Sequence, residues 1–331
     1  MTRDDARTLD CHAHYVSPHA IRAAREHPER YGARIERTAE GERVLMPGER
    51  PGRSFLPEIL SLAERGERLP GLTHQLTSCW MDLSGYHLAA DEGQRWCSLL
   101  NDALAEDIAD TGSELRFLGM ATVPMQAPEA AGRELERCVR SHGFRGAMIG
   151  ANVAGENLDL SRFDPFWRQA EELGVPIILH PFSVAIADRV PRFYLDNAVG
   201  NPTDTTIAAA SLIFGGVLDR FPELQIVLVH GGGFLPYQWG RLDQARRVRP
   251  ETAVAGAGMP SDYLRRFFYD SIVFSPGALR YLIDLVGADR VVVGTDYPFD
   301  MGASEPLENL GAAGVDSEAS RLVREAASLR V

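Results

Sequence analysis

Short apolar runs alternate with longer amphipathic segments along most of the chain. Two of the runs, VPIILH at 175–180 and LQIVLVH at 224–230, are continuously apolar, which is typical of parallel strands buried on both faces. The remaining strands are expected at 7–14, 74–81, 116–123, 146–149, 267–274 and 290–295. The pattern therefore predicts eight short strands.

The segments between these runs have helical spacing. In 91–110, Trp96, Leu100 and Leu104 fall on one side of a helix. Glycine follows the expected helices at 164–173 and 276–286, where it suits a helix C-terminus. Further helices are expected at 57–68, 127–141, 203–220, from the glycines at 231–233 to about 248, and at 316–329.

Eight strands that alternate with helices predict an α/β fold of the (β/α)8 TIM-barrel type. An open doubly wound sheet is the alternative, although no Gly-x-Gly-x-x-Gly motif follows a strand, which weakens its dinucleotide-binding version. A length of 331 residues suits one barrel domain over 1–331. The Arg-rich segment 17–56 carries several prolines and glycines, and it is expected to be an irregular, polar insertion after strand one, over the mouth of the barrel.

Composition narrows the class of protein. The net charge of −12 argues against nucleic acid or an anionic membrane surface as a partner. The four cysteines form no Cys-x-x-Cys motif, which favours reduced thiols and a cytoplasmic location. The charged start of the chain does not resemble a secretory signal, and no apolar run approaches the roughly 18 residues of a membrane span.

Potential metal ligands stand at the ends of four expected strands. His12 and His14 end the first strand and point to the same side, because side chains alternate along a strand. His180 ends the fifth strand, His230 the sixth, and Asp296 follows the eighth. Because the active site of a (β/α)8 barrel lies at the C-terminal ends of its strands, these side chains are expected to meet.

Three histidines and one aspartate suit one Zn²⁺ ion, with Mn²⁺ as the alternative and no organic cofactor. We expect His12, His14, His180 and Asp296 to be the ligands. His230 is expected to remain free as a general acid or base, because the three glycines that follow it would leave room for water and substrate.

Four blocks resemble the signatures of the metal-dependent amidohydrolase superfamily: DCHAH at 10–14, HPF at 180–182, HGGGFLP at 230–236 and GTDYPF at 294–299. The similar branch contains aminocarboxymuconate-semialdehyde decarboxylase and the hydroxybenzoate decarboxylases. The resemblance extends from residue 10 to about 301. It implies the same four metal ligands and a catalytic role for His230, together with Asp296.

The resemblance also implies a reaction. The expected enzyme is a metal-dependent carbon–carbon lyase, which removes CO₂ without oxidation from a small aromatic or dienoic acid that carries a hydroxyl or amino group. The first alternative is a hydrolase, hydratase or cyclising enzyme that uses a metal-activated water at the same site. The second is a non-catalytic barrel that only binds a ligand.

Substrate contacts are expected from arginines and aromatic residues. By resemblance, Arg241 reaches the site of the neighbouring subunit in a homodimer, although a solvated helix arginine is the alternative. A second substrate arginine is expected in the segment after strand one, where the candidates are Arg43, Arg50 and Arg53. A pocket for a flat acid could be formed by aromatic side chains, or these could serve packing alone: Trp80, Phe182, Tyr194, Phe234 and Phe299.

Overall fold

The computed structural model describes residues 7–47, 52–253 and 255–331. Within these ranges, eight strands pair in parallel in two sheets, with the orders β1-β4-β5 and β12-β11-β10-β9-β6. Their bounds are Leu9–Tyr15 (β1), His74–Cys79 (β4), Arg116–Met120 (β5), Ala147–Gly150 (β6), Pro176–His180 (β9), Gln225–Leu228 (β10), Phe267–Asp270 (β11) and Val291–Val292 (β12). The predicted strands are thus present, and several are shorter than expected, most of all β11 and β12.

Isolated bridges and backbone hydrogen bonds join the edges of the two sheets. Ala121, directly after β5, forms a parallel bridge with Ala147 of β6. At the other edges, Ala13 of β1 bridges to Tyr297, and the amide of Cys11 donates to the carbonyl oxygen of Val293 at 2.8 Å. Both pairs of edge strands therefore lie next to each other.

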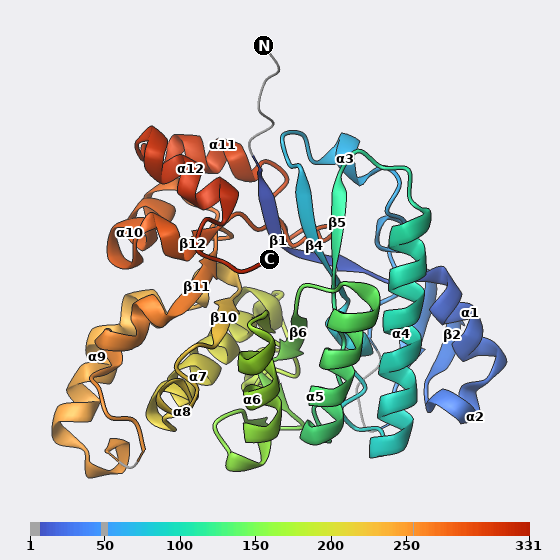
Figure 1. The fold of residues 1–331 in the computed structure, drawn as a ribbon, viewed down its shortest axis with the longest axis horizontal. Helices are drawn as coiled ribbons and strands as arrows, with labels where there is room; N and C mark the ends of the chain where they lie inside the picture. The colour runs from blue at the N-terminus through green and yellow to red at the C-terminus, as the bar shows by residue number, and fades with distance from the viewer. Residues whose placement is uncertain (1–6, 48–51, 254) are drawn as a thin grey trace.

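Helices lie outside the strands (Figure 1). The bounds of the longer ones are Ala90–Asp110 (α4), Pro128–Arg137 (α5), Asp164–Leu173 (α6), Asn201–Phe214 (α7), Leu235–Val248 (α9) and Pro276–Val286 (α10). Shorter ones are Arg65–Arg68 (α3), Val217–Arg220 (α8), Pro306–Ala312 (α11) and Ser317–Glu325 (α12). The helix expected over 203–220 is divided, because Gly216 has a φ of +69° that ends the helical path.

The segment between β1 and β4 differs from the prediction. It is not irregular: it forms α1 (Pro18–Glu26), α2 (Pro28–Tyr31) and a hairpin of β2 (Arg34–Thr38) and β3 (Gly41–Leu45). Nor is it only polar cover, because its apolar side chains join α4 in a second buried cluster that includes Ile21, Tyr31, Val44, Phe55, Trp96 and Leu100. Residues 48–51, and with them Arg50, lie outside the described residues.

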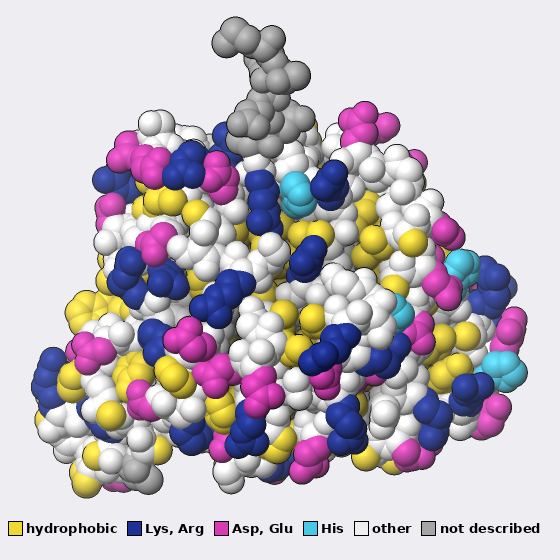
Figure 2. Space-filling view, in the orientation of Figure 1, with side chains coloured by type: hydrophobic (Ala, Val, Ile, Leu, Met, Phe, Trp, Pro, Cys, Tyr) yellow, Lys and Arg dark blue, Asp and Glu magenta, His cyan; other side chains and the backbone are white. Residues whose placement is uncertain are grey.

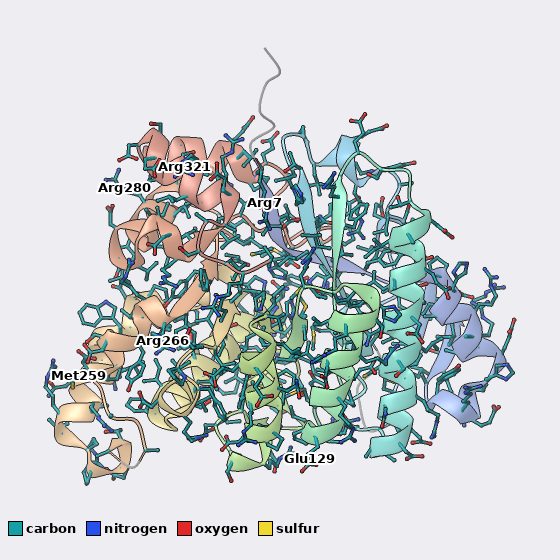
Figure 3. All side chains as sticks on the ribbon, viewed as in Figure 1. Arg7, Glu129, Met259, Arg266, Arg280 and Arg321 are labelled. Atoms are coloured by element: carbon teal, nitrogen blue, oxygen red, sulfur yellow. The ribbon has the colours of Figure 1, made fainter. Side chains whose placement is uncertain are left out.

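The main core consists of the strands and the inner faces of the helices. Ile177, Ile178 and Leu179 of β9 are fully buried, as their continuous apolar run predicted. All four cysteines are buried and free. On one face of the molecule, acidic and basic side chains are interspersed (Figure 2), and labelled arginines such as Arg280 and Arg321 project outward (Figure 3). Among the described residues, no helix is long and apolar enough to cross a membrane.

Candidate metal centre

Strand β1 brings two buried imidazoles together. The Nε2 atoms of His12 and His14 are 3.2 Å apart, and both side chains have no exposed surface. Cys11 and Ala13 point the other way, into the core. The alternation that placed the two histidines on one side is therefore confirmed.

The other predicted residues reach the same point from different strands. His180 ends β9, and its ring centroid lies 5.1 Å from that of His12 and 5.6 Å from that of His230. Asp296 follows β12, and its Oδ1 lies 3.0 Å from Nε2 of His14 and 3.4 Å from Nε2 of His12. Strands far apart in the sequence thus deliver five potential ligands to one place.

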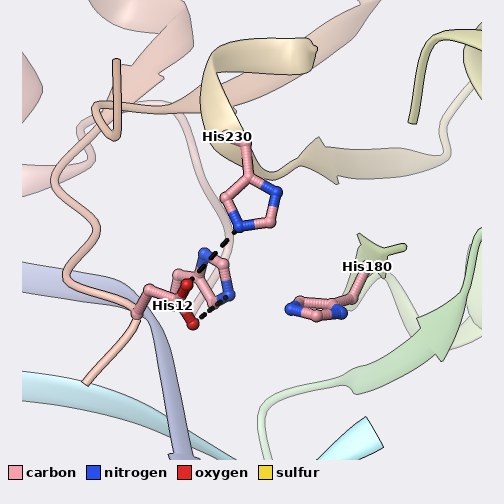
Figure 4. A group of neighbouring side chains, drawn as sticks. His12, His180 and His230 are labelled. Carbon is pink, nitrogen blue, oxygen red and sulfur yellow. Dashed lines mark ion pairs between the residues drawn. The ribbon is translucent and has the colours of Figure 1, made fainter. Parts of the chain in front are cut away.

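Four of these side chains can be grouped around one point. Single ligand atoms of His12, His180, His230 and Asp296 all lie within 4.8 Å of one another (Figure 4). Nε2 of His230 is 3.5 Å from Oδ2 of Asp296. This group contains His230 in place of the predicted ligand His14, so the distances alone do not separate the ligands from the catalytic residue.

The protonation of the cluster suits a bound cation. Burial lowers the pKa of His14, and burial together with the neighbouring imidazoles lowers that of His180 well below its usual value. Burial opposes ionisation of Asp296, but the surrounding histidines outweigh it and hold its pKa well below normal. Within the described residues, Nδ1 of His14, Nδ1 of His230 and Oδ1 of Asp296 are buried without a hydrogen-bond partner. The neutral imidazoles of His14 and His180 beside the carboxylate of Asp296 are donors that a divalent metal fits.

Hydrogen bonds on the outer ring nitrogens orient two of the imidazoles. Nδ1 of His180 lies 2.8 Å from the carbonyl oxygen of Pro181, and Nδ1 of His12 lies 2.8 Å from Oδ2 of Asp270. Burial would lower the pKa of His12, but the carboxylates of Asp296 and Asp270 outweigh it and raise that pKa. A partner on Nδ1 directs Nε2 toward the centre, as in metal-binding histidines generally.

Asp270 is a site residue that the sequence analysis missed. It is fully buried at the end of β11, and its Oδ1 accepts hydrogen bonds from the amides of Gly231 at 2.7 Å and Ile272 at 3.1 Å. It therefore ties His12 to the turn that carries His230. The signal was present in the sequence, because the run FFYD ends in a carboxylate just as other strands end in a histidine.

Replacing Asp270 with asparagine should weaken metal binding by about 10- to 100-fold, the usual effect of removing a partner of a metal-binding histidine. The amide has only one oxygen with which to replace the two carboxylate oxygens that hold His12 and Gly231. Competition with a chelating dye measures the affinity. Asp284→Asn on α10, where the carboxylate pairs with Arg280 at the surface, is the matched control. Equal affinity of the Asp270 and Asp284 variants would contradict the assigned role.

The three glycines after His230 have a different purpose from the one predicted. Gly231, Gly232 and Gly233 have φ values of +62°, +78° and +63°, which glycine adopts readily. A Cβ atom would lie 2.3 Å from Val273 at the first position and 2.2 Å from the carbonyl oxygen of Pro202 at the third. The glycines thus permit a tight, closely packed turn, and they do not leave open space beside His230.

A cavity of about 660 Å³ lies against the cluster. His180 and Asp296 form part of its wall, and residues 44, 46, 52 and 53 of the segment after β1 form another part. Trp80, Phe182, Tyr194 and Phe299 line it as predicted. Phe234 is not among the lining residues and is 41% exposed, so its inclusion in the pocket was wrong.

Two candidate arginines differ in their position. Nη1 of Arg53 donates to the hydroxyl of Tyr194 at 2.7 Å at the cavity wall, whereas Arg43 pairs with Glu36 on the hairpin. The wall also contains Asp82, which the sequence analysis missed and whose pKa burial raises to about 6. Of these two candidates for a substrate contact, Arg53 lines the cavity and Arg43 does not.

Arg241 does not reach the cavity of its own chain. It is exposed on α9, in line with the exposed residues Phe234 and Tyr237, which precede it by seven and four positions. This spacing places the three side chains on one face of the helix.

The family model described as amidohydrolase matches residues 9–327. The chain belongs to the amidohydrolase family. This amidohydrolase is 37% identical over 223 residues to 2-amino-3-carboxymuconate-6-semialdehyde decarboxylase of Dictyostelium discoideum, in a match that covers 67% of this chain and 62% of that protein. It is 36% identical over 233 residues to gamma-resorcylate decarboxylase of Polaromonas sp., with 65% and 70% covered. The matched part is thus about three fifths of the length of the first relative.

The amidohydrolase also has the fold of a solved decarboxylase structure. The crystal structure of dihydroxybenzoic acid decarboxylase from Polaromonas sp. JS666, with bound manganese and 2-nitroresorcinol, superposes with a TM-score of 0.76 at 23% identity. The superposition covers 96% of this chain and 94% of the other. The resemblance to this branch, predicted from the sequence, is confirmed.

Proposed function

We propose that this amidohydrolase is a metal-dependent, non-oxidative decarboxylase of a small aromatic or dienoic acid with a hydroxyl or amino substituent. The observation that carries the proposal is the convergence of four histidines and Asp296 beside a cavity with aromatic walls. The decarboxylase names of the two relatives support this reaction over hydrolysis, hydration or cyclisation.

We further propose that the two sheets close into one (β/α)8 barrel domain over 1–331, with 17–56 as an insertion at its mouth. The contacts at both pairs of sheet edges support closure. The cavity wall formed by residues 44, 46, 52 and 53 supports a place for the insertion at the mouth. The four free cysteines support a cytoplasmic location.

His12, His14, His180 and Asp296 would hold one divalent ion. Three imidazoles and a carboxylate favour Zn²⁺, and Mn²⁺ is the alternative because the Polaromonas decarboxylase structure contains manganese. When bound, the ion supplies positive charge that holds the substrate's oxygen atoms and stabilises negative charge on them.

His230 would donate the proton. Its imidazolium protonates the ring or chain carbon that bears the carboxylate, a step that uses one electron pair of a double bond. The bond to the carboxylate carbon then breaks, and its electron pair restores that double bond as CO₂ departs. His230 regains a proton from solvent. Asp296, with Oδ2 at 3.5 Å from Nε2 of His230, would orient this imidazole as well as bind the metal. Trp80 and Phe182 would pack against the flat acid, and Arg53 would bind an anionic group at the cavity wall.

An anaerobic assay for CO₂ tests the function. The chain, loaded in parallel with Zn²⁺ and Mn²⁺, is incubated with hydroxy- and amino-benzoic acids and with dienoic acids in ¹⁸O-labelled water. The expected result is CO₂ release and a product one carboxyl group smaller, without oxygen consumption. Incorporation of ¹⁸O into the remaining product, or a product lighter by one water, would replace the proposal with hydrolysis, hydration or cyclisation.

We also propose a homodimer in which Arg241 completes the neighbouring site. Phe234, Tyr237 and Arg241 form an exposed face of α9 that begins four residues after His230. Exposed aromatic side chains beside an arginine are typical of the centre of a protein interface. Because Arg241 does not reach the cavity of its own chain, it is available to contact the cavity of a neighbouring subunit across such an interface.

Mixing two inactive variants should therefore restore activity. In a dimer of one Arg241→Ala subunit and one His230→Ala subunit, one site has both wild-type residues, so activity should rise to roughly a quarter to half of the wild-type value when half or all of the dimers are mixed. Differently tagged subunits, purified through both tags, measure this directly. Mixed dimers as inactive as either parent would contradict a role of Arg241 across the interface, and a monomer in solution would contradict the dimer itself.

A further inference from the structure

Arg65, in the short helix α3, is a buried cation beneath the metal centre. Only 1% of its surface is exposed. Nε donates to the carbonyl oxygen of Ser61 at 2.9 Å, Nη1 to Oε1 of Gln75 at 3.0 Å, and Nη2 to the carbonyl oxygen of His14 at 2.6 Å. All three acceptors are neutral. Because burying a charge on neutral partners costs free energy, stability alone is a weak reason for an arginine here.

One of these bonds reaches a candidate ligand directly, and a second continues through the core. Gln75, which accepts from Arg65, in turn donates through Nε2 to Oδ2 of Asp10 at 2.8 Å. Oδ1 of Asp10 accepts from the amide of His12 at 3.1 Å and from the amide of Thr295 at 3.0 Å. The chain of hydrogen bonds therefore begins at Arg65 and ends on the backbone of β1 and on the residue before Asp296.

The guanidinium also contacts Tyr297, the residue that follows Asp296. It lies 5.0 Å from the ring centroid of Tyr297, and the amide of His14 donates to the carbonyl oxygen of Tyr297 at 2.8 Å. The peptide groups on both sides of His14 are thus fixed, one by Arg65 and one by Tyr297. The side chain of His14 places Nε2 at 3.0 Å from Oδ1 of Asp296.

We propose that Arg65 is a positioning residue that fixes His14 and Asp296 relative to each other, so that the metal centre is formed before the ion binds. It acts directly through the His14 carbonyl and the Tyr297 ring, and indirectly through Gln75, Asp10 and Thr295. The proposal rests on the proposed metal centre, and it adds a residue from the segment between β1 and β4 to that centre. Arg65 does not touch substrate, so its effect appears in metal binding and geometry.

The test compares Arg65→Met, which keeps most of the apolar volume but no donor, with Arg65→Lys, which keeps the charge. Zn²⁺ affinity is measured by competition with a chelating dye. Arg65→Met should bind Zn²⁺ about 10- to 100-fold more weakly than the parent chain, and Arg65→Lys should fall between them. The visible spectrum of the Co²⁺-loaded protein, which reports ligand geometry, should change in Arg65→Met.

Leu212→Ala, in the buried face of α7, is the control for lost core packing. It should lower the melting temperature without changing the Zn²⁺ affinity or the Co²⁺ spectrum. An Arg65→Met chain with parental affinity and spectrum would overturn the positioning role. If Arg65→Met does not fold, parental values in Arg65→Lys would overturn it. A parent chain that binds neither ion would instead overturn the proposed metal centre, and this is visible before any variant is compared.

Discussion

The His12→Ala variant is expected to lose its bound divalent ion and all measurable CO₂ release. His12 has contacts on both ring nitrogens, because its Nε2 is 3.2 Å from His14 and 3.4 Å from Asp296 while its Nδ1 contacts Asp270. Removing it takes away one ligand and leaves the Asp270 carboxylate without that partner. Metal affinity should fall by more than about 100-fold, beyond the effect expected when only a ligand's supporting partner is lost.

Elemental mass spectrometry on protein not exposed to chelators measures this loss. The parent chain should contain about one ion per chain. His74→Ala is the matched control, because His74 begins β4 at the opposite end of a strand and bonds to Thr73. It should keep the metal. Full metal content in His12→Ala would contradict the centre, and so would a parent chain that stays metal-free when Zn²⁺ and Mn²⁺ are supplied.

The residues of the site that could be predicted are those at the C-terminal ends of parallel strands. In parallel strands all C-terminal ends face the same way, so residues that end strands meet even when they are far apart in the sequence. His180 and Asp296 could be placed by this argument without knowledge of any contact. Asp270 satisfies the same rule and was missed, because the seventh strand was expected to run to residue 274, which placed Asp270 inside it, whereas β11 ends at Asp270.

Arg65 could not be placed by such an argument. Its role depends on a hydrogen bond to a backbone carbonyl 51 positions away, and backbone acceptors leave no mark in the sequence. The same holds for the glycines after His230, whose reason is the close approach of Val273 and Pro202. Sequence pattern reports which residues are available at a site, whereas the close packing around them is settled only by tertiary structure.

The segment after β1 shows a different limit. Its many arginines and prolines suggested an irregular insertion, yet Ala20, Ile21 and Ala24 are buried along one side of α1. A short amphipathic helix with charges on its outer face has the average composition of a loop. The spacing of its few apolar residues was the better guide, since burial depends on which positions are apolar and not on how many are.

His230→Ala should keep the metal and lose the chemistry. If His230 only donates a proton, kcat should fall by about 10²- to 10⁴-fold, the usual contribution of a general acid, while metal content stays near that of the parent. His14→Ala should instead lose the metal, and its activity should be lost as a consequence. His142→Ala, which removes a histidine paired with Asp102 away from the centre, should change neither.

The comparison of these two variants decides the roles that distances leave open. His230 belongs to the group whose ligand atoms lie within 4.8 Å of one another, whereas Nε2 of His14 lies only 3.0 Å from Asp296. Metal loss in His230→Ala with metal retained in His14→Ala would make His230 the ligand and His14 the candidate acid. That outcome would keep the metal centre but change the proton donor. Metal kept and activity kept in His230→Ala would remove the proposed proton transfer altogether, since no other imidazole of the cluster would then be free of the ion.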